Sequence, residues 1–281
     1  MKIFWINGAP WLDELKPELE KLGHEFVEDD PDVIIGWSVT QMDRIWRAFS
    51  RFPAAKLVNY NWDVYGWVWE RPRKGEYNYK LYGALLKNSD EVWCPSQCTV
   101  ERMKQWFGKD GLVIKTFIPL YEHETKDENY ALCSLREIPD QNLGWFEKAC
   151  EELKIPYVSN RHHTYTWEEW KRIVANCSFI VAPYYELSTG GLDIIQGYYL
   201  GKPGLLSDSS WNGGWDYLGH RAFSFKHDSY EDFKVQLKKL WETRPKVEKD
   251  HKEFVKENYS VEVMAKKISE RLCTLITKTD S

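Results

Sequence analysis

Hydrophobic and polar positions along the chain follow two spacings that alternate from the first residue onward. Short apolar runs such as Lys2–Ile6 and Phe179–Ala182 have the length and composition of buried strands. The segments between such runs repeat their apolar residues at helical spacing. Strands that alternate with helices are typical of βαβ units, whose strands form a parallel sheet. The pattern therefore predicts an α/β protein.

The predicted elements are distributed evenly over the chain. In the first half we predict strands at 2–6, 25–28, 33–36, 55–59, 91–95 and 112–117, and helices at 12–22, 40–52, 79–87 and 99–107. In the second half we predict strands at 130–134, 157–158, 179–182, 204–207 and 222–225, and helices at 143–153, 166–176, 192–200, 230–243 and 247–258.

A polar segment without periodicity, 120–129, interrupts this pattern and is typical of a linker between two sheets. We therefore predict one domain over 1–120 and a second over 121–259. Ser260 has the character of an N-cap for a last amphipathic helix over 261–272, within the terminal segment 260–281. The length of 281 residues, with 43% hydrophobic residues, suits two domains with cores of their own.

Composition excludes several classes of function. The net charge of −5 gives no overall attraction to nucleic acid or anionic lipid. No apolar run approaches the roughly 20 residues that span a bilayer, and the N-terminus has the pattern of a strand rather than of a signal peptide. The 6 cysteines form no Cys-x-x-Cys pair and are expected to be buried thiols in a reducing compartment. We expect a cytoplasmic protein, with peripheral membrane association left open, and neither a bound metal nor a tightly bound cofactor.

The stretch 179–219 contains the strongest functional signal. Its strand leads through a polar loop into a Ser-Thr-Gly-Gly turn, directly before a predicted helix. Backbone N–H groups in the first turn of a helix have no intrahelical partner, and the helix dipole favours negative charge there. Glycines permit close approach of an anion, and hydroxyl groups add donors. The stretch predicts a diphosphate site, with a plain tight turn as the alternative. The residues of this site are Ser188, Thr189, Gly190, Gly191 and Leu192.

The same stretch resembles the donor-binding signature of retaining glycosyltransferases of the GT-B fold, especially the GT4 family (glycosyl transferases group 1). That signature reads Pro-Ser-x-x-Glu-Gly-Phe-Gly-Leu-Pro-x-x-Glu-Ala-x-x-x-Gly-x-Pro, followed by a strand and a Gly-Gly pair. The resemblance extends over the second half of the chain and, in layout alone, over the first half. The matching positions are Pro183, Glu186, Gly191, Leu192, Gly201, Pro203, Gly213 and Gly214.

This sequence departs from the family pattern at two positions. Gln196 stands where the family has its second glutamate, and Asp193 offers a carboxylate on a neighbouring helical face. Gln141 stands where the family has a lysine, whereas Arg136 matches the accompanying arginine. Glu186 lies two residues upstream of the usual spacing.

The resemblance implies a GT-B architecture, in which two Rossmann-like domains have parallel sheets facing a central cleft and the terminal helix crosses back to the first domain. It implies transfer of a hexosyl group from a UDP- or GDP-sugar to a hydroxyl acceptor, with retained anomeric configuration. No DxD motif stands out for a catalytic divalent ion, so we expect the reaction to be metal-independent. Arg136 would neutralise the diphosphate, and a surface ion pair is its alternative role. Glu186 would hold sugar hydroxyls, Gln196 or Asp193 would hold the ribose, and loop 160–165 would hold the base.

Loops after strands of the first half complete the predicted site. Gly8 follows the first strand, where the GT-B fold places a loop near donor or acceptor; a simple strand-to-helix turn is the alternative. Polar side chains and tryptophans follow the fourth strand and suggest an acceptor surface, with a solvated loop as the alternative. We assign Asn61, Trp62 and Trp67 to acceptor binding and place Asp63 with the catalytic candidates.

An arginine stripe in helix 40–52 leaves a further possibility open. Arg44, Arg47 and Arg51 share one face beside the apolar face of Ile45 and Phe49. Such a stripe is typical of a solvated face, and anionic lipid or DNA is the alternative partner.

Three classes of function remain open from the sequence. The first is a glycosyltransferase whose acceptor is a saccharide, a lipid-linked sugar or a modified DNA base. The second is a non-catalytic GT-B-like protein that binds a nucleotide sugar, which Gln141 and Gln196 would favour. A purely structural α/β protein would leave the predicted anion site unexplained.

Overall fold

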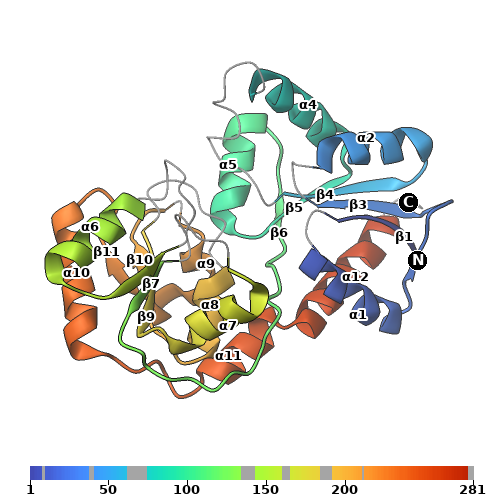
Figure 1. The fold of residues 1–281 in the computed structure, drawn as a ribbon. Helices are drawn as coiled ribbons and strands as arrows, with labels where there is room; N and C mark the ends of the chain where they lie inside the picture. Colours follow the sequence, from blue (N-terminus) through green and yellow to red (C-terminus); the bar gives the residue numbers. More distant parts are fainter. Residues whose placement is uncertain are drawn as a thin grey trace. The chain divides into compact units, whose positions relative to one another are not determined.

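The computed structural model describes residues 1–7, 10–37, 41–61, 75–133, 143–159, 165–183, 192–210 and 212–277, with the backbone alone for 10, 75–79 and 192. The protein is α/β and is built on two parallel sheets, as predicted (Figure 1). Its internal contacts divide the chain into two units. The N-terminal unit comprises Met1–Pro119 and Asn258–Ser281, and the C-terminal unit comprises Leu120–Glu257.

The N-terminal unit contains a six-stranded sheet in the order β2-β1-β3-β4-β5-β6. Every adjacent pair is parallel. The strand order reverses between β1 and β3, because β2 lies on one side of β1 and all later strands lie on the other. The strands are β1 (Lys2–Ile6), β2 (Glu25–Phe26), β3 (Val33–Trp37), β4 (Lys56–Tyr60), β5 (Glu91–Cys94) and β6 (Leu112–Val113).

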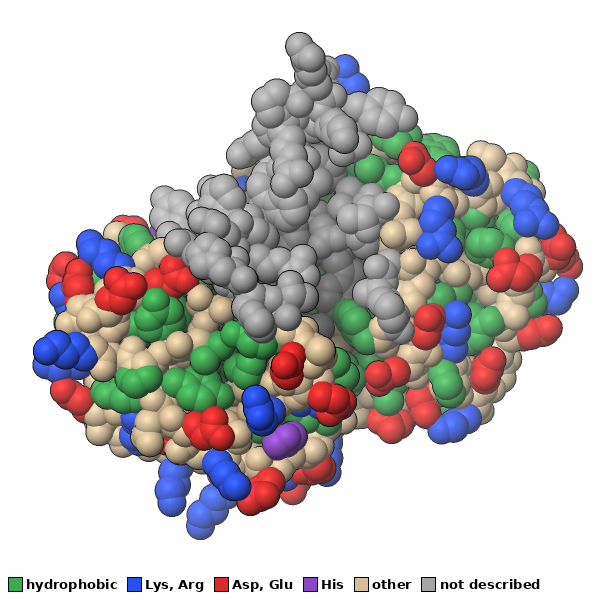
Figure 2. All heavy atoms as spheres, in the orientation of Figure 1, with side chains coloured by type: hydrophobic (Ala, Val, Ile, Leu, Met, Phe, Trp, Pro, Cys, Tyr) green, Lys and Arg blue, Asp and Glu red, His purple; other side chains and the backbone are tan. Residues whose placement is uncertain are grey.

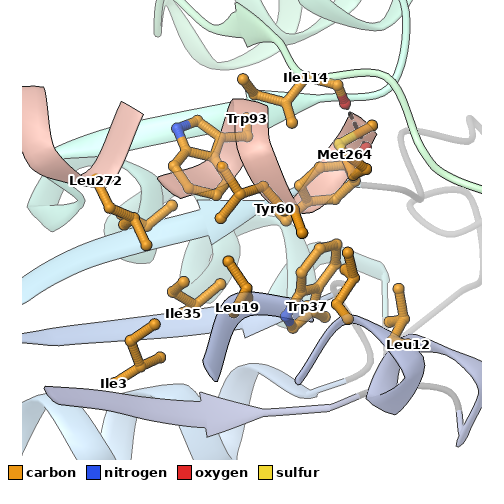
Figure 3. Packing of buried hydrophobic residues seen from close by; sticks show 14 of the residues in the cluster. Ile3, Leu12, Leu19, Ile35, Trp37, Tyr60, Trp93, Ile114, Met264 and Leu272 are labelled. Atoms are coloured by element: carbon orange, nitrogen blue, oxygen red, sulfur yellow. Dashed lines mark hydrogen bonds between the residues drawn. The ribbon is translucent and has the colours of Figure 1, made fainter. Parts of the chain in front are cut away.

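Helices cover both faces of this sheet. They are η1 (Pro10–Glu14), α1 (Leu15–Lys21), α2 (Met42–Arg51), α4 (Gly75–Asn88), α5 (Gln97–Phe107) and α12 (Val261–Thr277). The last helix, α12, packs with α1 on one face, where Met264 and Leu272 join residues of β1, β3, β4 and β5 in one buried cluster (Figure 3). On the other face α2 lies close to β3. A Cβ added to Gly36 of β3 would lie only 2.5 Å from Ile45 Cδ1 of α2.

The chain leaves and re-enters the N-terminal unit at one place. Ile118 N donates a hydrogen bond to Tyr259 O over 2.9 Å, and Lys115 Nζ lies 3.3 Å from Tyr259 Oη. Ser260 begins the returning helix: its hydroxyl accepts from Val263 N at 3.4 Å, the N-cap position expected from the sequence.

The C-terminal unit contains a five-stranded parallel sheet in the order β11-β10-β9-β7-β8. Here the order reverses between β7 and β9. The strands are β7 (Ala131–Cys133), β8 (Tyr157–Ser159), β9 (Phe179–Ala182), β10 (Gly204–Ser207) and β11 (Phe223–Phe225). The helices are α6 (Leu143–Leu153), α7 (Trp167–Asn176), α8 (Leu192–Tyr199), α9 (Gly214–Leu218), η4 (Gly219–Arg221), α10 (Tyr230–Thr243) and α11 (His251–Tyr259).

Several predicted elements differ in their bounds from the structure, and for two of them the reason is identifiable. β6 ends at Val113 rather than continuing to 117, because Phe117 turns into the core and packs on Trp11 with ring centroids 5.2 Å apart. The helix predicted over 247–258 begins at His251, because Glu248 and Asp250 form polar contacts with neighbouring elements instead.

The described surface shows charges of both signs. On the face in Figure 2, acidic and basic side chains are interspersed over each unit. No described helix is both long and apolar enough to cross a bilayer.

Candidate functional site

The reversal of strand order in the C-terminal unit defines where a ligand is expected. β7 and β9 are parallel neighbours, with Ala131 opposite Phe179 and Leu132 opposite Ile180. Their carboxyl ends, Cys133 and Ala182, therefore lie at the same edge of the sheet. Ligands of open α/β sheets bind outside the carboxyl ends of strands at such a reversal.

The segments that follow these two strand ends contain most of the predicted donor residues. Residues 134–142 follow β7 and residues 184–191 follow β9, and both segments lie outside the described residues. Predicted site residues that follow β1 and β4 also lie outside the described residues, with the exception of Asn61. The predicted site residues outside the described part of the chain are Gly8, Trp62, Asp63, Trp67, Arg136, Gln141, Glu186, Ser188, Thr189, Gly190 and Gly191.

Helix α8 begins at Leu192, directly after the predicted Ser-Thr-Gly-Gly turn. It packs closely on the sheet at two glycines. A Cβ on Gly197 would lie 2.1 Å from Ile180 Cδ1 of β9, and one on Gly204 of β10 would lie 3.2 Å from Ile194 Cγ2. The helix ends before Gly201, whose φ of +81° lies in the left-handed region. The start of α8 is thus held at the carboxyl edge next to β9, where its first-turn amides are suited to an anion.

Asp193 lies in the first turn of α8 and is half-buried. One of its carboxylate oxygens, Oδ1, accepts a hydrogen bond from Trp170 Nε1 of α7 at 2.8 Å. The indole of Trp170 is 9% exposed, and its ring lies 5.8 Å from the ring of Tyr165. The first turn of α7 is itself fixed by a capping box between Thr166 and Glu169. Asp193 therefore has a rigid hydrogen-bond donor beside it.

Gln196, the second candidate for the ribose, has a different environment. It is 4% exposed, and its Nε2 donates to the backbone oxygen of Tyr121 at 3.3 Å. Its Oε1 is buried and has no hydrogen-bond partner among the described residues. The Tyr121 hydroxyl is likewise buried without such a partner. Burial, with a smaller contribution from the charge of Asp193, raises the pKa of Tyr121 well above its usual value.

Sequence reasoning missed Trp170 and Tyr121 as neighbours of this site. Trp170 has the helical spacing of a core residue, and Tyr121 lies in the polar segment that we predicted as a linker. Neither position has a sequence signal that points to α8, because both contacts join segments far apart in the chain. Only the packing of α7 and of residues 120–122 against α8 brings them together.

The end of β10 presents a second ordered turn at this edge. Asn212 is buried, and its Oδ1 accepts from the backbone N of Gly214 at 3.0 Å. Trp215 Nε1 donates to the backbone oxygen of Ser207, the last residue of β10, at 2.7 Å. These bonds fix the Gly213–Gly214 pair that resembles the family's Gly-Gly, and they explain the short helix α9, which the sequence did not predict.

In the N-terminal unit, Asn61 is the described member of the predicted acceptor surface. It follows β4 and is fully buried, with its amide nitrogen directed at Met103 Sδ of α5. Its Oδ1 has no partner among the described residues, and neither side-chain polar atom of Asn59 has one. The carboxyl end of β4 is thus a buried polar position, and the assignment of Asn61 to acceptor binding stays a prediction.

The arginine stripe of α2 is exposed, as expected for a solvated face. Arg44 donates to Gln41 Oε1 at 2.9 Å, and Arg51 forms an ion pair with Asp29. The core face of α2 is formed by Met42, Ile45 and Ala48, with Phe49 only partly buried.

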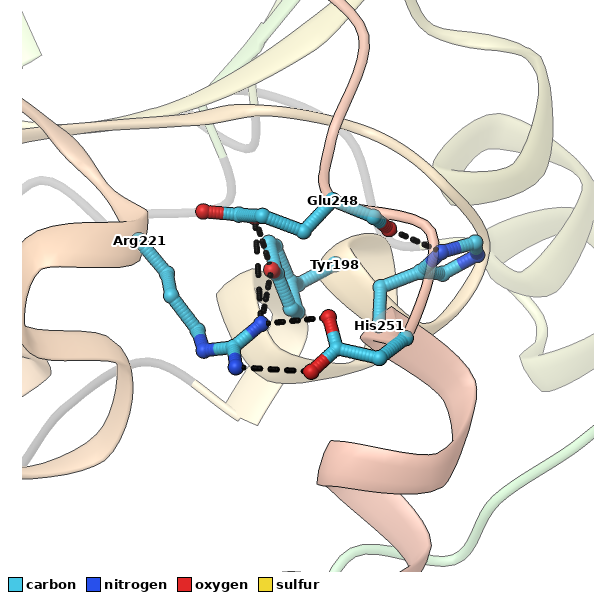
Figure 4. A network of polar contacts seen from close by, with 5 residues as sticks. Tyr198, Arg221, Glu248 and His251 are labelled. Carbon is cyan, nitrogen blue, oxygen red and sulfur yellow. Dashed lines mark hydrogen bonds and ion pairs between the residues drawn. The ribbon is translucent and has the colours of Figure 1, made fainter.

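A polar network at the opposite end of α8 is structural. Arg221 contacts the hydroxyl of Tyr198 and both carboxylate oxygens of Asp250, and Tyr198 also contacts Glu248 (Figure 4). Tyr198 is in the last turn of α8, so the network lies away from the carboxyl edge of the sheet. It attaches α11 to α8. Among the described residues, no group of three or more His, Cys, Asp or Glu side chains could hold a metal ion.

Comparisons with known proteins show the fold. No protein-family model matches the sequence, and no curated protein matches it either. Among solved structures, the chain is similar to a sucrose-phosphate synthase from Thermosynechococcus elongatus, with a TM-score of 0.73 and 12% identity over 99% of this chain and 100% of that one. It is similar to HepE of Anabaena in complex with UDP and glucose, with a TM-score of 0.72 and 11% identity over 98% and 100% of the two chains. It is also similar to the catalytic domain of starch synthase IV from Arabidopsis thaliana, with a TM-score of 0.59 and 12% identity over 94% and 75%. These likenesses show a GT-B fold.

Proposed function

We propose that this protein is a glycosyltransferase that moves a hexosyl group from a nucleoside-diphosphate sugar to a hydroxyl acceptor. The observation that supports this most directly is the placement of α8. Its first turn lies beside the carboxyl end of β9, next to the reversal of strand order. A GT-B fold with such a helix start offers the diphosphate a set of backbone donors.

The named neighbours agree with this proposal. One HepE structure contains UDP and glucose and another contains UDP-glucose, so proteins of this fold bind the proposed class of donor. We propose UDP- or GDP-sugar as the donor and a saccharide, a lipid-linked sugar or a modified DNA base as the acceptor. We further propose a GT4-like, retaining and metal-independent reaction, on the basis of the sequence resemblance.

In the proposed reaction the bond between the anomeric carbon and the diphosphate breaks, and the diphosphate leaves with the electron pair. The acceptor oxygen forms the new bond to the anomeric carbon, and its proton passes to the departing diphosphate oxygen. Arg136 and the amides of 188–192 would stabilise the negative charge that develops on the diphosphate. Glu186 would hold sugar hydroxyls, Asp193 or Gln196 would hold the ribose, and Asp63 stays a catalytic candidate. Gly8 and Gln141 complete the proposed donor contacts.

The test is binding followed by turnover. Isothermal titration with UDP, GDP and ADP should show binding of at least one of them. Hydrolysis or transfer of the matching nucleotide sugar should fall by about 100-fold or more in Arg136→Ala, because removal of one preorganised charge at a developing anion costs on that order. Glu186→Ala should also lose turnover. Arg47→Ala, an exposed arginine of α2, is the matched control and should retain activity.

Each outcome separates the candidate functions. Binding without turnover across an acceptor panel would favour the non-catalytic nucleotide-sugar-binding protein. Full activity in both site variants would show that the site is assigned wrongly. If no nucleoside diphosphate binds, the proposed function is excluded. Activity that persists in EDTA, and the anomeric configuration of the product by NMR, would test the metal-independent and retaining assignments.

A further inference from the structure

We infer that the first turn of α7 carries a saccharide-binding surface, on which the indole of Trp167 stacks against the ring of a neutral sugar. The group formed by Trp167, Glu168, Lys171 and Tyr121 is called the Trp167 surface below. This inference goes beyond the donor and acceptor contacts proposed above and does not depend on them, because none of these four residues has a part in the proposed reaction.

Trp167 differs from the other described tryptophans in its exposure. It is 53% exposed, whereas every other tryptophan among the described residues is buried or partly buried. Trp170, on the same helix, is one of the buried indoles and is bonded to Asp193. Exposure alone does not identify a site, because single exposed apolar side chains are common on protein surfaces. The contacts of the Trp167 ring are the further evidence.

The indole of Trp167 is held in place by two neighbouring side chains. The Tyr121 ring meets it nearly edge-on, with ring centroids 5.9 Å apart and an interplanar angle of 80°. The ammonium of Lys171, one helical turn later, lies 5.5 Å from the centre of the indole and 5.6 Å from the centre of the Tyr121 ring. Such contacts orient an aromatic ring. An exposed ring that is already oriented loses less conformational entropy when a ligand binds.

A hydrogen-bond acceptor lies at the edge of this ring. Glu168 Oε1 accepts from Lys171 Nζ at 2.7 Å, so the carboxylate is held next to the ammonium that contacts the indole. The side chain of Lys171 is only 21% exposed, whereas that of Glu168 is 80% exposed. The carboxylate is therefore accessible to hydroxyl donors of a ligand, and it can accept several of them. The Trp167 surface thus combines a flat apolar ring with an oriented acceptor.

A sugar ring matches this combination. A pyranose presents C–H groups on a face of its ring and hydroxyl groups around its edge. The hydrogens of the C–H groups are weakly positive, and the face of an indole carries negative charge density, so the two attract each other. The hydroxyl groups can donate to a carboxylate. A neutral saccharide therefore satisfies both parts of the Trp167 surface at once.

Other partners fit this surface less well. The first turn of α7 carries two exposed carboxylates, Glu168 and Glu169, which disfavour anionic lipid and nucleic acid. A stable protein interface buries about 800 Å² on each partner. On α7, the exposed large apolar side chain is that of Trp167 alone, which is far smaller than such an interface. Charge and size both favour a sugar.

The position of α7 places this surface on the functional side of the C-terminal unit. The helix connects the carboxyl end of β8 to the amino end of β9, so its first turn lies toward the carboxyl edge of the sheet. The bond from Trp170 to Asp193 places the following turn beside the start of α8. A saccharide on the Trp167 surface would therefore lie near the candidate donor site and outside its diphosphate contacts.

The experiment follows the indole N–H signal of Trp167 by NMR in the full chain, and this signal is identified by its absence in Trp167→Phe. Three neutral probes are added separately, cellohexaose, maltohexaose and chitohexaose, each to about 10 mM. We expect at least one of them to shift the signal saturably. In calorimetry, Trp167→Ala should weaken the affinity for that saccharide about tenfold or more, because it removes the stacking ring. Glu168→Gln should weaken it severalfold, because a neutral amide is a weaker acceptor than a carboxylate.

Matched variants give the test its controls. Phe223→Ala removes an aromatic side chain of β11 that is also exposed, and it should leave the affinity unchanged. Trp167→Tyr keeps an aromatic ring and should retain most of the affinity. Both variants of Trp167 should melt close to the native protein, because an exposed side chain contributes little to stability. Loss of binding in Trp167→Ala is then not a result of unfolding.

Several results would overturn the inference. They are an unshifted Trp167 signal with all three saccharides, or native affinity in Trp167→Ala. Binding to phosphatidylglycerol vesicles that is lost in Trp167→Ala would show a membrane contact instead. A fall in affinity for UDP, GDP or ADP in the same variant would assign the indole to the donor. The proposed function is judged separately, by nucleotide binding and sugar-nucleotide turnover of the native protein, so either conclusion can fail while the other stands.

Discussion

Each unit attaches a helix from the last part of the chain through an arginine–carboxylate pair, but the two pairs lie in different environments. In the N-terminal unit, Arg271 of α12 bonds Glu91 of β5, whose side chain is 9% exposed. In the C-terminal unit, Arg221 bonds Asp250 at the start of α11, and the Asp250 side chain is 58% exposed. The same chemistry therefore has different energetic consequences, because solvent screens the exposed carboxylate of the second pair more strongly than the buried carboxylate of the first.

The residues around the two pairs also differ, with more apolar burial around the first pair than around the second. Glu91 also accepts from Trp93 Nε1 at 2.9 Å, so the carboxylate is fully engaged inside a buried cluster that includes Ile268 and Leu272 of α12. Arg221 instead packs on α11, with its guanidinium 4.2 Å from the ring centroid of Phe254. Apolar burial attaches α12, and the ion pair adds a constraint on its position. At α11 the polar network is a larger part of the attachment.

The largest effect is expected from Arg271→Met. This change leaves the Glu91 carboxylate buried with the Trp93 indole as its remaining donor, which should cost about 2–3 kcal/mol of the stability of the N-terminal unit. Native-state hydrogen exchange at β4 and β5 amides would measure it for this unit alone. Lys267→Met, an exposed position of the same helix, is the control and should be nearly neutral. A neutral Arg271→Met would show that the pair is as weak as the exposed one.

A smaller effect is expected when both partners are replaced together. Glu91→Leu/Arg271→Met removes the buried charge, so apolar contacts replace the pair, and we expect a loss of about 1 kcal/mol, chiefly from the unpaired Trp93 indole. The same exchange measurement applies. A double variant less stable than Arg271→Met would contradict the view that the stranded carboxylate is the main cost.

The smallest effect at neutral pH is expected from Asp250→Asn, and its signature is the pH dependence. The hydrogen bond from Arg221 lowers the pKa of Asp250 below its usual value near 3.8. A lowered carboxyl pKa contributes stability above the unfolded value and loses it as the pH falls through about 3.8 and below. Asp250→Asn removes this titrating group. The melting temperature of the variant should therefore fall less steeply between pH 5 and pH 3 than that of the native protein, by the contribution of about one carboxyl group. Asp228→Asn changes an exposed carboxyl of the same unit and is the control, and an unchanged profile in Asp250→Asn would refute the role of the pair.

Much of the fold was predictable because its strands are short apolar runs with clear ends. β1, β9 and β10 match the predicted bounds, and so do α6 and α10. These elements depend on local patterns: apolar spacing, Ser229 as a helix cap, and Gly201 after a helix. The GT-B fold also followed from a family resemblance whose motif lies on these elements.

The remaining features depend on contacts between distant segments. α9 forms because Asn212 and Ser207 accept hydrogen bonds from its first residues, which a Gly-Gly pair alone does not indicate. The pairing of Trp170 with Asp193 and of Gln196 with Tyr121 arises from how α7 and the linker pack on α8. From the sequence alone, either Asp193 or Gln196 could hold the ribose, because both are polar residues of the predicted helix. The sequence therefore left this choice open.

The bond between Ile118 and Tyr259 has a consequence for the architecture as a whole. The backbone departs from one domain and returns to it at adjacent points, so residues 120–257 have the connectivity of an insertion. Adjacent exit and return points are where proteins tolerate inserted domains best. The C-terminal unit thus has the connectivity of a cassette, exchangeable in evolution or in the laboratory by recombination at two neighbouring junctions.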